Sequence, residues 1–253
     1  MSTAGPVPAP SPIQPQDSSS PIMRVLQTIY APSKAYSGLK PATDWIIPLI
    51  IMAILSLVFV YAVDKKVGFD TVQANQMKMS PKAAERMERL PEAQREQQMR
   101  MAVTITRFAS YGAFLFIGIW SLIIALVLWG TFSALGARVG FGSSFSIVML
   151  SWIPGVFKTI LATVVLFAGI DPEGFSIQNT VATNLGVIFD PINSRFLYSL
   201  GSAIDIFMIW TLIVAAIGFS VVGKVKKSTA FMVIFGWYAV VTLVGAGLGA
   251  LFA

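Results

Sequence analysis

Residues 108–137 contain no Asp, Glu, Lys or Arg, and four other segments of the chain come close to the same behaviour. The hydrocarbon core of a bilayer is about 30 Å thick, and an α-helix needs roughly 20 apolar residues to cross it. A core helix of a soluble protein rarely stays uncharged over such a length. The run therefore predicts an integral membrane protein in contact with the lipid bilayer.

The other uncharged segments extend this prediction to the whole chain. Charged residues make up 12% of the sequence, about half their share in a soluble domain. In hydrocarbon only helices and closed barrels satisfy the backbone, and these runs lack the alternation over about ten residues that barrel strands have. We predict an all-α polytopic membrane bundle with five transmembrane helices. Charges and turn signals place the spans at residues 45–63, 108–135, 146–169, 196–222 and 229–252.

The chain contains neither His nor Cys. It therefore lacks an imidazole base, a thiolate nucleophile and a Cys/His metal site. We expect no enzymatic activity, no cofactor and no metal centre.

Two polar segments flank the first span. Residues 1–21 are rich in Pro and Ser and predict a disordered tail, which leaves residues 22–253 as the membrane domain. Residues 64–107 mix basic and acidic side chains, and the helix-start signals Ser80-Pro81 and Leu90-Pro91 predict a polar hairpin of two short helices. The interleaved Glu residues cancel most of the field that phosphate binding needs, so we expect no nucleic-acid partner.

Residues 22–40 differ from the tail because Ile22, Val25, Leu26 and Ile29 recur at helical spacing. One interpretation is an amphipathic helix on the membrane surface. The other is a short helix packed on the bundle.

The short loops indicate the orientation. Lys224, Lys226 and Lys227 lie between the last two spans, whereas residues 170–195 are mainly acidic. This places the N-terminus in the cytoplasm, although the same assignment puts the basic residues of the hairpin outside.

Lys158 and Asp205 fall inside predicted spans, where a charge costs at least a few kcal/mol. If their helices are antiparallel neighbours, the two side chains lie at similar depth and can pair. An ion or proton relay is one interpretation. We favour a structural ion pair, because two isolated groups make a sparse transport path.

Two further features of the spans concern helix shape and packing. Pro154 cannot donate a backbone hydrogen bond, so we expect a kink in the third span. Gly245 and Gly249 share one face of the last span and would let another helix approach, within the chain or in a homo-oligomer.

The order of these features resembles the Yip domain family, named for proteins that interact with Ypt and Rab GTPases. The resemblance lies in residues 24–26, 32–36, 39–41, 45, 48, 150–154 and 204–210, the last with an Asp-x-Phe-x-x-Trp run. It implies five spans and, in eukaryotic members, a cytosolic N-terminus, binding of Rab-type GTPases and roles in vesicle traffic and membrane shaping. The chain lacks the Asp-Leu-Tyr-Gly-Pro signature of many eukaryotic members. Its hairpin resembles the bacterial branch, and these departures argue against Rab binding. If the source is bacterial, the resemblance implies an inner-membrane protein.

Two functional hypotheses follow. The first is a non-enzymatic membrane scaffold that recruits protein partners through its tail or its hairpin. The alternative is a small transporter or channel subunit that uses Asp205 and Lys158.

Overall fold

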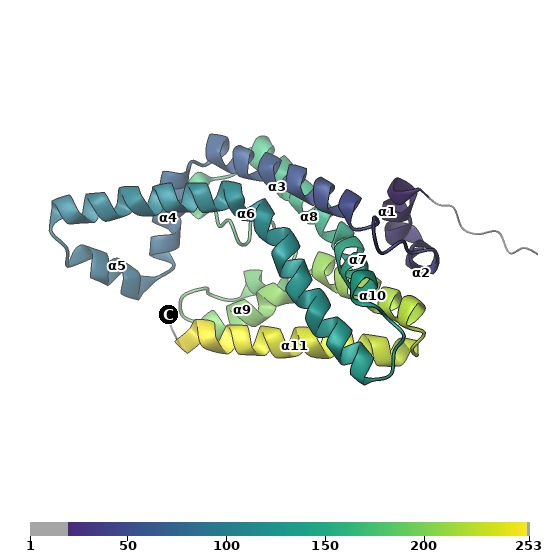
Figure 1. The fold of residues 1–253 in the computed structure, drawn as a ribbon. Helices are drawn as coiled ribbons and strands as arrows, with labels where there is room; N and C mark the ends of the chain where they lie inside the picture. The colour runs from purple at the N-terminus through teal and green to yellow at the C-terminus, as the bar shows by residue number, and fades with distance from the viewer. Residues whose placement is uncertain (1–19, 252–253) are drawn as a thin grey trace, which may run out of the picture.

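The computed structural model describes residues 20–251, so residues 1–19 of the predicted tail lie outside the described part. Five helical segments are long and apolar enough to cross a membrane, which confirms the predicted all-α polytopic bundle (Figure 1). They are α3 (Ile46–Lys66), α6 (Glu92–Ala134), the consecutive pair α7 (Phe141–Ser151) and α8 (Ile153–Ala168), α10 (Ile206–Gly223) and α11 (Lys227–Leu251).

The polar segment 64–107 was predicted to form a hairpin of two short helices, but the structure differs from this. Helices α4 (Phe69–Lys78) and α5 (Pro81–Glu88) form its first part, and α5 begins at the predicted Pro81. The second part is continuous with the membrane span: α6 follows Pro91 and runs for 43 residues, about 65 Å at 1.5 Å per residue. This is twice the thickness of a bilayer core, so α6 extends well beyond the hydrocarbon. We call α4, α5 and residues 92–107 of α6 the arm.

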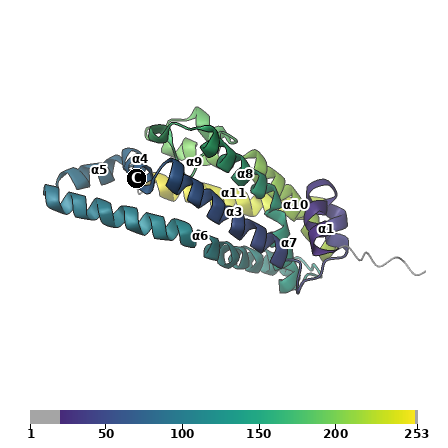
Figure 2. The same ribbon diagram turned by 90° about the horizontal axis from the view of Figure 1, so that it is seen from above.

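The elements gather at two ends of the bundle (Figures 1 and 2). Helices α1 (Pro21–Tyr30) and α2 (Pro32–Ser37) lie at one end, with the loops 135–140 and 224–226. A hydrogen bond of 3.3 Å from the Arg138 amide to the Gly223 carbonyl joins the loop 135–140 to the end of α10. The arm and Leu251 lie at the other end. The connection between α8 and α9, which contains the 3-10 helices η1 (Pro172–Gly174) and η2 (Leu185–Ile188), also lies toward that end.

Helix α1 packs on the bundle, as the second interpretation of its sequence predicted. Its buried face carries Arg24, whose Nε lies 3.3 Å from Asp44 Oδ2. Val25 is buried beside it, whereas Ile22 and Leu26 of the predicted apolar stripe are exposed. The helix therefore packs on the bundle through a mixed face and turns apolar side chains outward.

Close helix packing occurs at Gly218 of α10. A Cβ there would lie 2.6 Å from Ile147 Cγ2 and 2.9 Å from Tyr36 Cε2. Gly218 thus lets α2 and α7 approach α10 within the buried core.

The prediction of close internal packing at Gly245 and Gly249 is wrong. An added Cβ at either residue would meet no atom of the described chain within 4 Å. Their shared face is therefore open within residues 20–251, and contact with a second copy of the chain stays a prediction.

Candidate functional site

The third span breaks where a kink was predicted. Helix α7 ends at Ser151 and α8 begins at Ile153, with Trp152 between them. Pro154 lies in the first turn of α8. Backbone N–H groups in a first turn have no partner within the helix, so the missing N–H of proline costs no hydrogen bond there. The Trp152 indole N–H donates to Ser121 Oγ of α6 at 3.2 Å.

The predicted fourth span, residues 196–222, is not one helix. It consists of α9 (Arg195–Ala203) and α10, separated at Ile204 and Asp205. Asp205 is therefore not in the interior of a span, because it caps the N-terminus of α10. An Asp directly before an apolar run is an N-cap signal that the sequence does contain.

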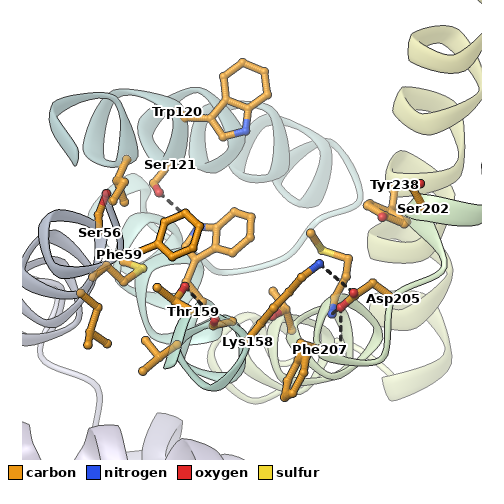
Figure 3. Close-up of a pocket in the computed structure, with 18 residues that line it drawn as sticks. Ser56, Phe59, Trp120, Ser121, Lys158, Thr159, Ser202, Asp205, Phe207 and Tyr238 are labelled. Atoms are coloured by element: carbon orange, nitrogen blue, oxygen red, sulfur yellow. Dashed lines mark hydrogen bonds and ion pairs between the residues drawn. The ribbon is translucent and has the colours of Figure 1, made fainter. Parts of the chain in front are cut away.

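Lys158 of α8 and Asp205 point toward each other (Figure 3). Lys158 Nζ lies 2.8 Å from Asp205 Oδ2, with side-chain exposures of 32% and 5%. The two residues that the sequence placed at similar depth are thus in direct contact. The Asp205 side chain is buried, whereas the Lys158 side chain is partly exposed.

Asp205 has all its acceptor positions filled. Its Oδ1 accepts from the backbone amides of Phe207 at 2.9 Å and Met208 at 3.2 Å. Its Oδ2 accepts from Lys158 and from Thr183 Oγ1, the latter at 2.6 Å. A carboxylate has about four acceptor sites, so no lone pair remains for another partner. A negative charge at this position also stabilises the N-terminus of α10.

Thr183 belongs to a loop that the sequence did not connect with this site. The Leu185 amide donates to the Ile204 carbonyl at 3.2 Å, and the Ile206 amide donates to the Thr183 carbonyl at 3.1 Å. These bonds satisfy backbone groups that the helix break would otherwise leave unpaired. The loop and α9 approach closely, since a Cβ on Gly201 would lie 2.9 Å from the Leu185 carbonyl oxygen.

The ion pair lies at the wall of a cavity of about 470 Å³ that α3, α6, α8, α9, α10 and α11 line. Its walls are mainly apolar, and polar groups lie among them (Figure 3). The Ser202 hydroxyl has no hydrogen-bond partner within residues 20–251. Tyr238 donates its hydroxyl hydrogen to the Ala203 carbonyl at 2.7 Å. The cavity therefore offers a hydrogen-bond donor at Lys158, next to an acceptor that is already saturated. The Ser202 hydroxyl lies instead against Gly186 of the loop that contains η2.

In residues 20–251 no group of three His, Cys, Asp or Glu side chains is placed to hold a metal ion. No curated protein and no solved structure matches the chain. The model of the Yip1 domain family matches residues 26–249, from α1 through α11. The match includes the first four segments of membrane-crossing length in full and the fifth up to residue 249. The chain therefore belongs to the Yip1 domain family and is a multi-pass integral membrane protein.

Proposed function

We propose that this protein is a non-enzymatic membrane scaffold that recruits protein partners through its arm. The observation that carries this proposal is a contrast within the arm. Its base, which comprises α4 and the residues of α6 near Arg107, is fixed to the bundle. Its tip, residues 80–99, is largely exposed.

The base of the arm is held first through α4. Phe69, Val72 and Asn75 are buried against the bundle. The Asn75 side-chain amide donates to the carbonyls of Pro172 at 2.8 Å and Phe175 at 3.0 Å. These contacts join α4 to the loop that follows α8, so the direction in which the arm leaves the bundle is fixed.

A second set of contacts holds α6 at the same level. Arg107 lies 2.8 Å from Asp64 Oδ2 of α3, and Tyr111 donates to the same oxygen at 3.0 Å. Thr106 Oγ1 donates to Gln73 Oε1 of α4 at 3.1 Å. Because α6 continues without a break from these contacts to residue 92, the tip is carried on a continuous helix.

The tip has a different character. No residue of α5 is buried, and the first residues of α6 are exposed as well. Both signs of charge are present, including an exposed pair between Glu96 and Arg100 at 3.0 Å. Such a surface suits a polar protein partner, whose complementary charges would set specificity and the rate of encounter.

Charge also supports an orientation for the scaffold. The end that carries α1 has one acidic residue in the described chain, Asp44, and Arg24 already pairs with it. The remaining basic residues at this end are Lys34, Lys40, Arg138, Lys224, Lys226 and Lys227. At the arm end, the short connection 169–194 contains no Lys or Arg. Because the positive-inside rule is most reliable for Lys and Arg in short loops, these loops favour a cytoplasmic N-terminus and an arm on the opposite side. If the source is bacterial, as the hairpin suggests, the membrane is the inner membrane.

The transporter alternative is less well supported. A proton relay through Asp205 would require this carboxylate to exchange its partners, and all four of its acceptor positions are occupied. We expect no proton flux through liposomes that contain the purified protein. A flux that the substitution Asp205→Asn abolishes would favour the transporter instead.

The recruitment proposal is tested by replacing residues 80–99 with a short Gly/Ser linker. This change removes the tip and leaves the contacts of Gln73, Asn75 and Arg107 in place. Partners are recovered by crosslinking and affinity purification from the native membrane. The matched control begins at residue 20 and lacks only the tail.

Proteins that are recovered with the full chain and with the tail-less control, but not with the linker variant, would support the proposal. An unchanged set of proteins in all three preparations would contradict it. Size-exclusion profiles in detergent show whether each variant is folded.

A further inference from the structure

We propose that the end of the bundle that carries α1 binds the headgroups of anionic phospholipids. The outer apolar stripe of α1 lies among the lipids, and exposed Lys and Arg side chains beside it bind the lipid phosphates. We call these side chains the basic cluster; they are Lys34, Lys40, Arg138, Lys224, Lys226 and Lys227. The cluster lies at the opposite end from the arm (Figure 1), so this proposal stands whether or not the arm recruits a protein.

Contacts between distant segments bring the basic cluster together. Lys40 is followed by Pro41, whose carbonyl accepts a hydrogen bond of 3.1 Å from Ser146 Oγ of α7. The Arg138 amide, in the loop before α7, donates to the carbonyl of Gly223 at 3.3 Å. Gly223 is the last residue of α10, and the remaining lysines of the cluster follow it directly. Three separate parts of the chain therefore contribute their charges to one surface.

The protein does not neutralise these charges itself. Within residues 20–251 no member of the basic cluster takes part in an ion pair. Asp44 is the one acidic residue described at this end; its side chain is 1% exposed and pairs with Arg24. Six positive charges thus face the surroundings without an accessible acidic neighbour in the described chain.

Helices α1 and α2 lie at the depth of the lipid headgroups. The loops 135–140 and 224–226 carry charge, so they mark the membrane surface. Tyr36 of α2 donates to the carbonyl of Ile147 at 3.4 Å and packs closely against Gly218. Both partners lie within two turns of the loop ends of α7 and α10, which places α2 within about 11 Å of the loops. Amphipathic helices at the membrane interface bury their apolar face to a similar depth, about 5 to 10 Å.

Helix α1 has an apolar face that the bundle does not cover. Ile22, Leu26 and Tyr30 follow one another at four-residue intervals and are exposed. Arg24 and Val25 occupy the opposite, buried face. At interfacial depth an uncovered apolar face contacts lipid, and Tyr is favoured at this level of the membrane.

The combination of charge and apolar surface selects the ligand. Lys and Arg bind phosphate oxygens through charge-assisted hydrogen bonds. Phosphatidylglycerol presents its phosphate with a net negative charge, whereas the choline of phosphatidylcholine offsets that charge. An acidic protein segment would satisfy the basic cluster but would leave the apolar stripe of α1 uncovered. An anionic phospholipid satisfies both.

The test uses phosphatidylcholine nanodiscs that contain the full-length protein and a small amount of photoreactive lipid. This probe has a diazirine at the start of one acyl chain and either a phosphatidylglycerol or a phosphatidylcholine headgroup. Labelled peptides are mapped by mass spectrometry after illumination. The readout is the ratio of phosphatidylglycerol to phosphatidylcholine labelling in residues 20–45, divided by the same ratio in residues 236–251, which contain no charged side chain. The division cancels differences in exposure and in probe reactivity.

The unmodified protein should show a normalised preference of about fivefold for phosphatidylglycerol. This corresponds to about 1 kcal/mol, the value typical of one Lys or Arg near an anionic membrane surface.

The triple variant Lys40→Gln/Arg138→Gln/Lys224→Gln should reduce the preference to near one. These side chains are exposed, and the contacts that join their segments use backbone groups of Pro41, Arg138 and Gly223, which the substitutions keep.

The matched control, Lys82→Gln/Arg86→Gln/Arg89→Gln, removes the same number of exposed charges from the tip of the arm. It should leave the preference unchanged.

A salt series tests the same proposal without any substitution. Raising the salt concentration from about 0.1 M to about 1 M shortens the Debye length from about 10 Å to about 3 Å. The preference of the unmodified protein should therefore fall toward one.

Two results would overturn the proposal. One is a normalised labelling ratio near one in the unmodified protein at low salt, which would mean that this end does not distinguish anionic lipid and would leave its charges to another partner. The other is a preference that neither the triple variant nor high salt reduces, because such a preference would not come from the basic cluster.

Discussion

Replacing Asp205 should destabilise the fold more than replacing its partner Lys158. Asp205→Ala removes all four hydrogen bonds of the carboxylate. The lost N-cap costs about 1 kcal/mol, and each lost bond to a charged side chain costs about 1.5 kcal/mol or more. The expected total is about 3 to 5 kcal/mol. It includes the penalty for a Lys158 ammonium that loses its counter-ion in a partly enclosed cavity.

Lys158→Met removes one of the four bonds and keeps the length of the side chain. The two backbone amides and Thr183 still hold the Asp205 carboxylate. The expected cost is therefore about 1 to 2 kcal/mol. In a chain of this size 1 kcal/mol corresponds to about 2 to 4 °C in Tm, so the two variants should be clearly separated.

The assay is thermal unfolding of both variants in the same detergent, followed by circular dichroism. Asp205→Asn is the informative control, because Asn is as good an N-cap as Asp but carries no charge. It should lie between the other two variants. If Lys158→Met were as destabilising as Asp205→Ala, Asp205 would not be the structural anchor that its hydrogen bonds imply.

Three further predictions concern the core, the arm and the loop before α9. Gly218→Ala should cost about 1 to 3 kcal/mol because its Cβ overlaps the core side chains, whereas Gly245→Ala should leave Tm unchanged; equal effects in thermal unfolding would refute this packing. Asn75→Ala should increase hydrogen exchange in α4 and α5, because it removes two bonds to the η1 loop; unchanged exchange would mean that the base is held without them. Hydrogen bonds from Asn193 and Ile192 lower the pKa of Asp190. The ionised carboxylate therefore stabilises the turn fully at pH values above the ordinary pKa of the group, and this stabilisation is lost as the pH falls through the lower pKa of the folded state. Proteolysis of this loop should accordingly increase below about pH 4, and the same acid sensitivity in Asp190→Asn would contradict the assignment.

The membrane spans could be predicted from the sequence because lipid imposes a length and excludes charge over that length. Helix starts at Pro81 and after Pro91 were also predictable, since proline is favoured in a first turn. The break before Asp205 was missed because the apolar residues around it continue the hydropathy of a single span, and this pattern hides the N-cap.

Contacts between distant segments were harder to predict. Gly218 packs closely against Tyr36 and Ile147, which are far from it in sequence. The Gly245 and Gly249 pattern is easier to recognise, yet its face is open. A single sequence gives the spacing of residues along a helix but not which face meets a neighbour. The same limit applies to Thr183, whose bond to Asp205 depends on how the intervening loop folds.

The central claim, that the arm recruits a protein partner, is tested most directly by site-specific photocrosslinking in the native membrane. A photoreactive amino acid is placed at Glu85, Arg89 or Glu96 of the exposed tip, or at the exposed Lys226 at the opposite end as a control. The scaffold account predicts discrete protein adducts from the tip positions that the Lys226 position does not give. Tip positions that yield no protein adduct, or the same adducts as Lys226, would contradict it.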